Sequence, residues 1–284
     1  MLGLIAHRLT PTNRWLLGAC GAVGIDAALL SPREALSCLS PGDTAIGRLD
    51  VRRSFDGVED GLWHLRRLER AGVRVLNRAP ALLAAHDKLQ TARRLEAVGL
   101  PHPQTVHVSS RRSALRLAPP VVLKPRFGSW GGDVLLCRSE DELQRNLSVV
   151  RQRDWFWQQG VLAQRFVAPQ DHDLRLVVAA GEVIGAVRRV AAPGEWRTNV
   201  ALGASRVPIE PTSGACALAL AATAAVGMDL AGVDLILAAS GEYVVLEVNG
   251  AVDFTRSYLR GADVFAVAVT ALLRRDESAE LALA

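Results

Sequence analysis

Three oxygen-bearing side chains near the C-terminal end of the chain have the types and spacing of ligands for a divalent cation. Asp234 lies in the apolar run 233–238 and Glu247 in the run 243–248, and the Ser-Gly pair between the runs predicts an antiparallel hairpin. Asn249 follows Glu247 by two residues, so both side chains project from one face of a strand. Two carboxylates and an amide oxygen suit Mg²⁺ held together with phosphate oxygens. A single solvated acid on an edge hairpin needs no metal, but two acids with an in-phase Asn favour a metal site.

Lysine is scarce in this chain. Of its 33 lysines and arginines only two, Lys88 and Lys124, are lysines, which leaves 31 arginines. These two therefore indicate positions where a compact ammonium fits and a planar guanidinium does not, with chance retention as the alternative. Lys88 follows Asp87, which is a predicted helix N-cap, and Lys124 ends an apolar strand. Both contexts suit contact with phosphate.

A glycine-rich stretch follows Lys124 directly. Residues 121–125 (VVLKP) predict a buried strand, residues 134–137 predict a return strand, and the turn between them contains FGSWGG. The bare backbone N–H groups of such a turn can close over phosphates. It is not a Walker A loop, because the Gly-Lys-Ser/Thr ending is absent. Many tight turns are glycine-rich without binding anything, so the adjacent lysine is what favours a phosphate site. Trp130 at the tip would either cover the site or anchor the loop.

The elements that must position these residues fall into three regions. The first alternates short apolar strands with helical patterns, which predicts a small parallel α/β domain. The second contains a helical region over 80–100 and the glycine-rich hairpin, and the third contains a hairpin over 173–190, the acid-bearing hairpin and a final helix around 262–273. The predicted boundaries are 1–80, 81–167 and 168–284.

Composition and charge argue against several classes of protein. The net charge of +4 is spread over many segments, so we expect no nucleic-acid partner. Gly18, Gly21 and Gly24 have the wrong spacing for a dinucleotide fingerprint. Apolar stretches are too short for a membrane span or a signal peptide. The four cysteines are far apart, which indicates small core residues in a reducing compartment. We therefore expect a cytoplasmic protein without a membrane partner.

The order of these parts resembles the ATP-grasp superfamily, and in particular the RimK-like carboxylate–amine (α-L-glutamate) ligases. The likeness covers about residues 45–273 and rests on V-V-L-K-P, F-G-S-W-G-G and E-V-N. G-S-W-G at 128–131 and E-V-N-G-A-V-D-F at 247–254 also resemble the LysX-type branch, which uses an amino-group-carrier protein. The resemblance implies an α/β (α+β ATP-grasp) fold, in which the N-terminal parallel domain precedes two antiparallel-sheet subdomains that sandwich the nucleotide.

The same resemblance implies roles for particular residues. The two lysines would contact phosphates, the glycine-rich turn would form a flap, and Asp173 would meet the ribose. Arg189 and Lys124 would steady the transferring phosphoryl group. Asp234, Glu247 and Asn249 would hold Mg²⁺ or Mn²⁺. The residues implied to bind ATP are Lys88, Lys124, Gly128, Ser129, Trp130, Gly131, Gly132, Gln164, Arg165, Phe166, Val167, Asp173, Arg197 and Asn199.

One position departs from the family pattern. Family members commonly carry Gln-Glu before the aromatic residue of the hinge strand, whereas this chain has Gln164-Arg165-Phe166. Adenine recognition would then rest on the main chain.

These parts predict an ATP-dependent ligase. A carboxylate attacks the γ-phosphorus of ATP to give an acyl phosphate and ADP, and an amine then displaces phosphate. Magnesium and the cations offset the charge on the transferring group, and the flap excludes water. We expect glutamate or a related amino acid as one substrate. The other would be an acidic acceptor, which could be a small molecule, a peptide or the C-terminus of a carrier protein.

Candidate substrate-binding residues come from basic segments, and an ordinary solvated loop is the alternative for each arginine. They are Arg52, Arg53, Arg175, Gly250 and Arg256, and Arg260 adds to the basic character after the acid-bearing hairpin. The family likeness also predicts a homo-oligomer. Two other functions stay open: a ligase of a natural-product or cofactor pathway, and a catalytically silent nucleotide-binding regulator. The intact lysine and metal-ligand set disfavours the regulator, because a pure binder does not need every metal ligand.

Overall fold

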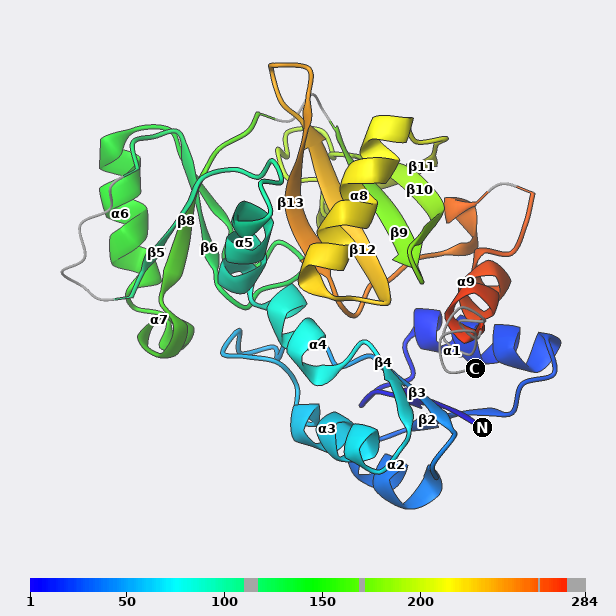
Figure 1. Ribbon diagram of the computed structural model, residues 1–284. Helices are drawn as coiled ribbons and strands as arrows, with labels where there is room; N and C mark the ends of the chain where they lie inside the picture. The colour runs from blue at the N-terminus through cyan, green and yellow to red at the C-terminus, as the bar shows by residue number, and fades with distance from the viewer. Residues whose placement is uncertain (110–116, 169–171, 260, 275–284) are drawn as a thin grey trace.

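The N-terminal part of the chain forms a parallel sheet with strand order β2-β1-β3-β4 (Figure 1). The computed structural model describes residues 1–109, 117–168, 172–259 and 261–274. Helices connect the four strands on both sides, as predicted for a small α/β domain. The elements are β1 (Leu2–Ile5), α1 (Pro11–Ala22), β2 (Ala27–Leu30), α2 (Pro32–Cys38), β3 (Thr44–Gly47), α3 (Leu62–Arg70) and β4 (Arg74–Leu76).

Helix α2 is absent from the sequence-based prediction, although its start carries a recognisable signal. The Ser31 hydroxyl accepts a hydrogen bond from the Glu34 N–H, and the Glu34 carboxylate accepts one from the Ser31 N–H. Pro32 occupies the first helical position. This capping box with an initial proline is a helix-start pattern that can be read from sequence.

The second sheet is antiparallel, with strand order β5-β8-β6-β7. Trp155 and Phe156 of α7, a helix that the sequence analysis missed, are buried against it. The predicted helical region over 80–100 is two helices that break at Asp87. The elements are α4 (Ala79–His86), α5 (Lys88–Ala97), β5 (Thr105–Val108), β6 (Val121–Pro125), β7 (Leu135–Cys137), α6 (Glu140–Val150), α7 (Asp154–Gln159) and β8 (Val161–Arg165).

The third sheet is the largest and is also antiparallel, with order β11-β10-β9-β12-β13. Both predicted hairpins are present, β9–β10 and β12–β13, whereas edge strand β11 was not anticipated. Helix α8 covers one face of the sheet (Figure 1). The elements are β9 (His172–Ala179), β10 (Glu182–Val190), η1 (Val200–Leu202), β11 (Ser205–Pro208), α8 (Ser213–Val226), β12 (Leu230–Leu237), β13 (Tyr243–Asn249), η2 (Arg256–Tyr258) and α9 (Val264–Leu273).

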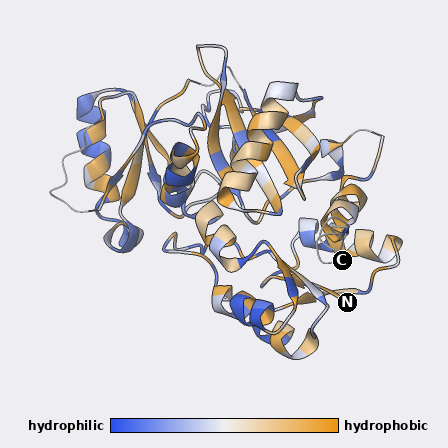
Figure 2. Cartoon of the chain, in the orientation of Figure 1, coloured by the Kyte–Doolittle hydropathy of each residue, from blue (hydrophilic) through white to orange (hydrophobic). Residues whose placement is uncertain are grey.

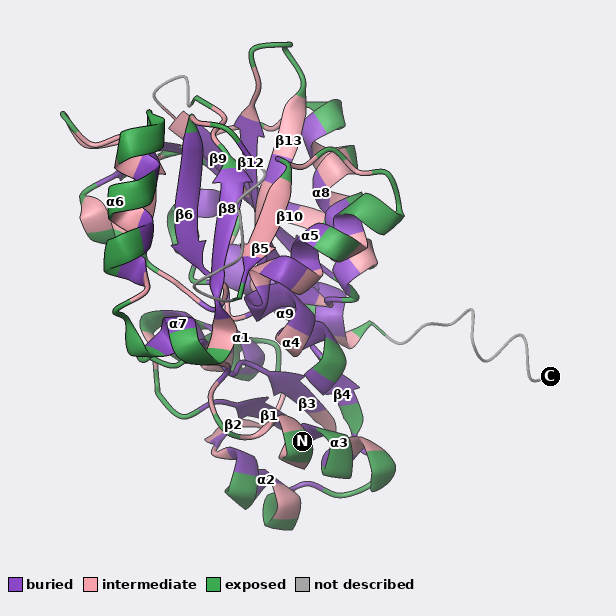
Figure 3. Ribbon diagram, turned by 90° about the vertical axis from the view of Figure 1, so that its left-hand side faces the viewer, coloured by how far each residue is buried: buried purple, intermediate pink, exposed green. Residues whose placement is uncertain are grey.

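The hydrophobic core joins the first and third sheets. Leu4 of β1 belongs to the same buried cluster as Leu230 of β12 and Phe265 of α9. The strands are largely hydrophobic and buried, while α2 and α6 turn exposed faces outward (Figures 2 and 3). The predicted boundaries after residues 80 and 167 fall between sheets, but the first sheet does not have a core of its own. The division into domains stays a prediction.

The cysteines only partly match the expectation of small core residues. Cys20 and Cys137 are buried, but Cys38 is exposed at the end of α2. All four thiols are free within the described part of the chain. In the same part, no helix combines the length and the apolar character needed to cross a bilayer.

Candidate active site

Two adjoining cavities lie where the three sheets meet. The first, of about 150 Å³, lies between the second and third sheets, and the second, of about 200 Å³, lies between the third sheet and the N-terminal region. The walls that they share include the flap and the middle of the third sheet. The shared lining residues are Lys88, Gly128, Ser129, Trp130, Arg189, Asn199 and Glu247.

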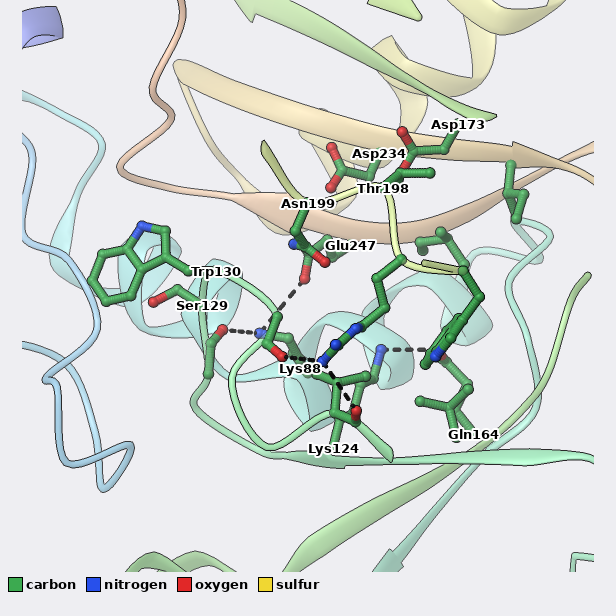
Figure 4. A pocket seen from close by; sticks show the side chains of 18 of the residues that line it. Lys88, Lys124, Ser129, Trp130, Gln164, Asp173, Thr198, Asn199, Asp234 and Glu247 are labelled. Carbon is green, nitrogen blue, oxygen red and sulfur yellow. Dashed lines mark hydrogen bonds and ion pairs between the residues drawn. The ribbon is translucent and has the colours of Figure 1, made fainter. Parts of the chain in front are cut away.

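Both lysines face the first cavity from the second sheet and its leading helix (Figure 4). The Lys88 Nζ donates a hydrogen bond to the Gly128 carbonyl and lies 3.6 Å from a Glu247 oxygen. The buried Lys124 Nζ donates to the Gln164 Oε1 at 2.8 Å. Burial lowers the pKa of Lys124 to about 8, and the nearby Glu247 carboxylate partly opposes this shift. The two residues singled out by their rarity therefore lie in one cavity with an acid.

Lys88 is held in place by the cap of its own helix. The Asp87 carboxylate accepts hydrogen bonds from the Leu89 and Gln90 N–H groups, as expected for an N-cap. It also accepts two hydrogen bonds from Arg126, at 2.7 and 2.5 Å. Arg126 precedes the flap, so this partly buried ion pair ties the start of α5 to the flap.

Charged side chains alternate along one face of the third sheet. In the strand register Asp234 lies opposite both Glu247 and Arg175, and Arg189 lies opposite Asp173. Since side chains two residues apart share a face of a strand, all five project into the cavities. Figure 4 shows Asp173 and Asp234 across the first cavity from the lysines, with Glu247 between them.

These charges are paired in a buried environment. Arg175 donates to both Asp234 oxygens at 2.6 Å, and Arg189 donates to Asp234 at 2.8 Å and to both oxygens of Asp173. Burial alone would raise the pKa of Asp234, but the two guanidinium groups outweigh it and hold that pKa well below its usual range. Burial would lower the pKa of Arg189, but the carboxylates of Asp234 and Asp173 outweigh burial and raise it. Asp234 therefore stays ionised.

The predicted metal ligands lie together, although Asp234 is already in contact with arginines. Within the described residues, no group of three or more His, Cys, Asp or Glu side chains could hold a metal ion. The predicted ligands are not such a group, because they are two acids and one amide. Asn249 Nδ2 donates to the Gly232 carbonyl at 3.4 Å, which leaves its amide oxygen to accept. The donor types fit a hard cation, provided that Asp234 exchanges guanidinium contacts for the metal.

The flap is held from two sides. Gly131 has φ +75°, and a Cβ there would lie 2.8 Å from the Asn199 Oδ1, so a side chain does not fit. The Arg197 Nη1 donates to the Gly131 carbonyl at 3.1 Å while the guanidinium pairs with Glu195 at 2.7 Å. On the other side, the Phe55 ring lies 2.7 Å from where a Cβ of Gly132 would be. Phe55 was not identified from sequence.

Part of the wall of the first cavity is apolar. It is formed by Val122, Ile236 and Leu246, and the rings of Phe166 and Trp196 meet edge to face at 5.7 Å. The Arg165 side chain is exposed, which agrees with recognition through the main chain at that position. Periodicity could not single out the three apolar residues, because they look like ordinary strand residues.

The predicted residues divide clearly between the cavities and the rest of the molecule. Every residue implied to bind ATP lines the first cavity, together with Arg189, Asp234 and Glu247. Asn249 and Arg175 line the second. Asp173 is engaged by Arg189 and by the Thr198 hydroxyl at 2.6 Å, so its expected ribose contact stays a prediction. Thr198 itself was missed, although it lies within the Arg-Thr-Asn loop.

Four of the five candidate substrate residues line neither cavity among the described residues. Arg52 pairs with Asp60 at 2.6 Å on an exposed loop that also carries Arg53. The Arg256 guanidinium stacks over Trp15 at 3.9 Å. Gly250 allows close packing, since a Cβ there would lie 3.0 Å from a Leu82 side chain. A role in substrate binding for these four residues stays a prediction, and Arg260 lies outside the described residues.

The second cavity contains residues that sequence reasoning missed. They come from short or irregular segments without a periodic signal. Burial lowers the pKa of His86 to about 4, and its Nε2 is 2.8 Å from the Leu49 carbonyl oxygen, so this imidazole is neutral. The missed lining residues with polar side chains are Asp50, His86, Arg206, Asp253 and Tyr258.

The chain matches a known family over most of this region. Residues 85–269 match the RimK-like ATP-grasp domain, which is more than half of the chain. The chain therefore belongs to the RimK-like ATP-grasp family, and the expected family is confirmed.

Named relatives and a solved structure agree with this assignment. Human N-acetylaspartylglutamate synthase A is 32% identical over 67% of this chain and 49% of its own length, so the chain spans about half of that relative. Glutamate–LysW ligase ArgX of Sulfolobus acidocaldarius is 28% identical over 75% of this chain and 78% of its own. A RimK domain ATP-grasp protein from Sphaerobacter thermophilus has TM-score 0.72 at 24% identity, covering 96% of this chain and 99% of that chain. This last similarity confirms the predicted fold.

Proposed function

We propose that the chain is an ATP-dependent carboxylate–amine ligase that forms an amide bond through an acyl phosphate. The observation that carries this proposal is the shared wall of the two cavities. Arg189, Lys88 and Glu247 border both, so a group transferred from a ligand in the first cavity meets a second ligand without leaving the protein. Family membership supports the same reaction class.

The lining of the first cavity suits ATP. The apolar part of the wall beside Phe166 and Trp196 suits a base, which can stack and accept main-chain hydrogen bonds. Lys88 and Lys124 line the same cavity and suit the triphosphate as compact charges. ATP-grasp proteins generally use ATP with Mg²⁺, and Asp234, Glu247 and Asn249 would hold that ion. When bound, the ion supplies charge neutralisation at phosphate oxygens. Mn²⁺ would bind to the same three residues in place of Mg²⁺.

This chain's own residues then favour transfer by position and charge. Arg189 is fixed by two carboxylates, so its guanidinium needs little reorganisation to stabilise charge on the transferring phosphoryl group. The carboxylate of one substrate attacks the γ-phosphorus from the second cavity, and ADP leaves. The amine of the other substrate then attacks the acyl carbon and releases phosphate. The flap, held by Arg197 and Phe55, keeps water from the acyl phosphate.

Glutamate is the amino acid that we propose for the amine. One relative is named as a glutamate–LysW ligase and another as an N-acetylaspartylglutamate synthase. Both names contain glutamate, whereas the group joined to it differs. The acceptor of this chain is proposed as an acidic small molecule, peptide or carrier-protein C-terminus. Cytoplasmic location and a homo-oligomer stay predictions.

The test is ADP release from MgATP with a panel of carboxylic acids, each paired with L-glutamate or with one of several other amines, followed by mass spectrometry of the product. A ligase gives ADP and an amide product in equal amounts with at least one pair. If ATP binds but no pair releases ADP above background, the catalytically silent regulator is the correct function. ADP release with another amine only would instead support a ligase of a natural-product or cofactor pathway.

A further inference from the structure

The second cavity is lined by four cations, and three of them already have acid partners. Arg175 pairs with Asp234 at 2.6 Å, Arg189 pairs with Asp173 and Asp234, and Lys88 lies 3.6 Å from Glu247. The fourth is Arg206 on edge strand β11. None of the ion pairs between described residues includes Arg206.

Arg206 also carries a polar atom without a partner. Its Nε is buried, yet nothing in the described part of the chain accepts a hydrogen bond from it. Leaving a charged donor buried and unpaired is costly, whereas a ligand that accepts from it recovers the lost hydrogen bond. Its cross-strand neighbour is Arg189, so two guanidinium groups stand side by side there. This arrangement favours an anion in the second cavity.

Such an anion would be distinct from the nucleotide. Arg206 lines the second cavity and is absent from the lining of the first, which contains the two lysines suited to phosphate. Asp50 and Asp253 line the second cavity as well. They suit the ammonium or amine end of a ligand and disfavour a highly charged phosphate. A molecule with a carboxylate at one end and an amine at the other matches this lining.

We propose that Arg206 determines substrate specificity by binding a free carboxylate of the amino acid that supplies the amine. The inference rests on the proposed function and adds the residue that selects one substrate. The planar guanidinium can donate two parallel hydrogen bonds to that carboxylate, which fixes its orientation. The carboxylate bound by Arg206 is not the one that attacks ATP. It takes no part in bond formation or cleavage.

The test is direct binding of L-glutamate in the presence of Mg²⁺ and a non-hydrolysable ATP analogue, measured by calorimetry. We expect the wild-type protein to bind L-glutamate more tightly than at least one of its monoamides, L-glutamine and L-isoglutamine. Arg206→Gln should weaken L-glutamate binding roughly ten- to a hundredfold and remove that preference. Arg206→Lys should recover part of the affinity, because the charge returns without the fork.

The matched control is Arg188→Gln, an exposed arginine on neighbouring strand β10 that lines neither cavity. It should bind both ligands as the wild type does, and unchanged affinity for the ATP analogue shows that each variant is folded. Wild-type L-glutamate affinity in Arg206→Gln overturns the inference, as does a wild-type protein that binds L-glutamate no better than both monoamides. Neither result bears on ADP release with a productive pair of substrates. The ADP assay therefore tests the proposed function independently of this inference.

Discussion

Glu247 is the residue on which the metal assignment depends most directly. It lies on the wall shared by the two cavities and is about one-quarter exposed, at 23%, whereas Asp234 is almost fully buried and paired with arginines. Glu247→Gln keeps the size of the side chain but removes its charge. We expect it to lower kcat by at least about a hundredfold and to weaken Mg²⁺-dependent ATP binding. Steady-state ADP release and nucleotide titration with and without Mg²⁺ measure both effects.

The control for that variant is Glu242→Gln, which alters an exposed acid in the turn of the same hairpin. It should retain full activity. Full activity in Glu247→Gln as well would remove the metal role from β13.

Lys124 predicts a pH dependence because its ammonium is buried. Its pKa is lowered from 10.5 to about 8, so the charged form is lost as the pH rises above 8. Since phosphate requires the charged form, kcat/KM for ATP should fall about tenfold per pH unit above that value and be insensitive to this group below it. Lys124→Arg should be slow, because the fork does not fit, but it should not show this decline. A wild-type profile that is flat to pH 10, or a variant with wild-type rates, would contradict the prediction.

At the scale of single residues, the sequence revealed charge chemistry better than substrate contacts. The acids and lysines were recognisable because each was unusual where it stood: an acid in an apolar run, or a lysine among arginines. Arg206 and His86 are not unusual in this way. Both line the second cavity, Arg206 from the short edge strand β11 and His86 from the end of α4. For Arg52 and Arg53 the sequence gives less guidance, because a basic loop has the same pattern whether or not it lines a cavity.

Among the elements, the flap and the loop carrying Phe55 form a unit that no local pattern predicted. Phe55 packs against the buried clusters of both the N-terminal region and the second sheet, and touches the flap near Gly132. Phe55→Ala should loosen the closed flap and admit water to the acyl phosphate. We expect ADP formation to exceed amide formation, with the uncoupled fraction rising roughly several-fold if the lost contact contributes about 1 kcal/mol. Parallel assays of ADP and product measure that ratio.

The neighbouring Arg53→Ala is the control, since it alters the same loop at an exposed position. It should keep ADP and product equal. Equal yields in Phe55→Ala too would show that the flap closes without this contact.

The same comparison explains which elements sequence could predict. Hairpins β9–β10 and β12–β13 were recognised from apolar runs around turn residues, and α5 from its cap at Asp87. Strand β11 has four residues with mixed burial, so alternation is too short to detect. Helix α7 has only six residues and no side-chain cap, and its buried tryptophan and phenylalanine look like any aromatic pair.

At the scale of the whole molecule, residues near the N-terminus and near the C-terminus pack in one hydrophobic core. Sequence patterns alone could not show this packing. Phe265 of α9 stacks on Phe254 with ring centroids 4.6 Å apart and on Trp15 of α1 at 6.2 Å. Phe265→Ala should therefore destabilise the N-terminal sheet and the third sheet together, by about 3–5 kcal/mol in free energy of unfolding. Denaturant unfolding followed by far-UV circular dichroism and tryptophan fluorescence measures the change.

Both probes should shift by the same amount if the first sheet has no independent core. Val98→Ala, at a position 59% exposed, should change neither curve appreciably. Saturating MgATP should raise the midpoint of Phe265→Ala, because a ligand that binds the folded state stabilises it by mass action. Separate transitions, with only one affected by the mutation, would show instead that the N-terminal sheet folds on its own, and that the second cavity forms by docking of two stable units.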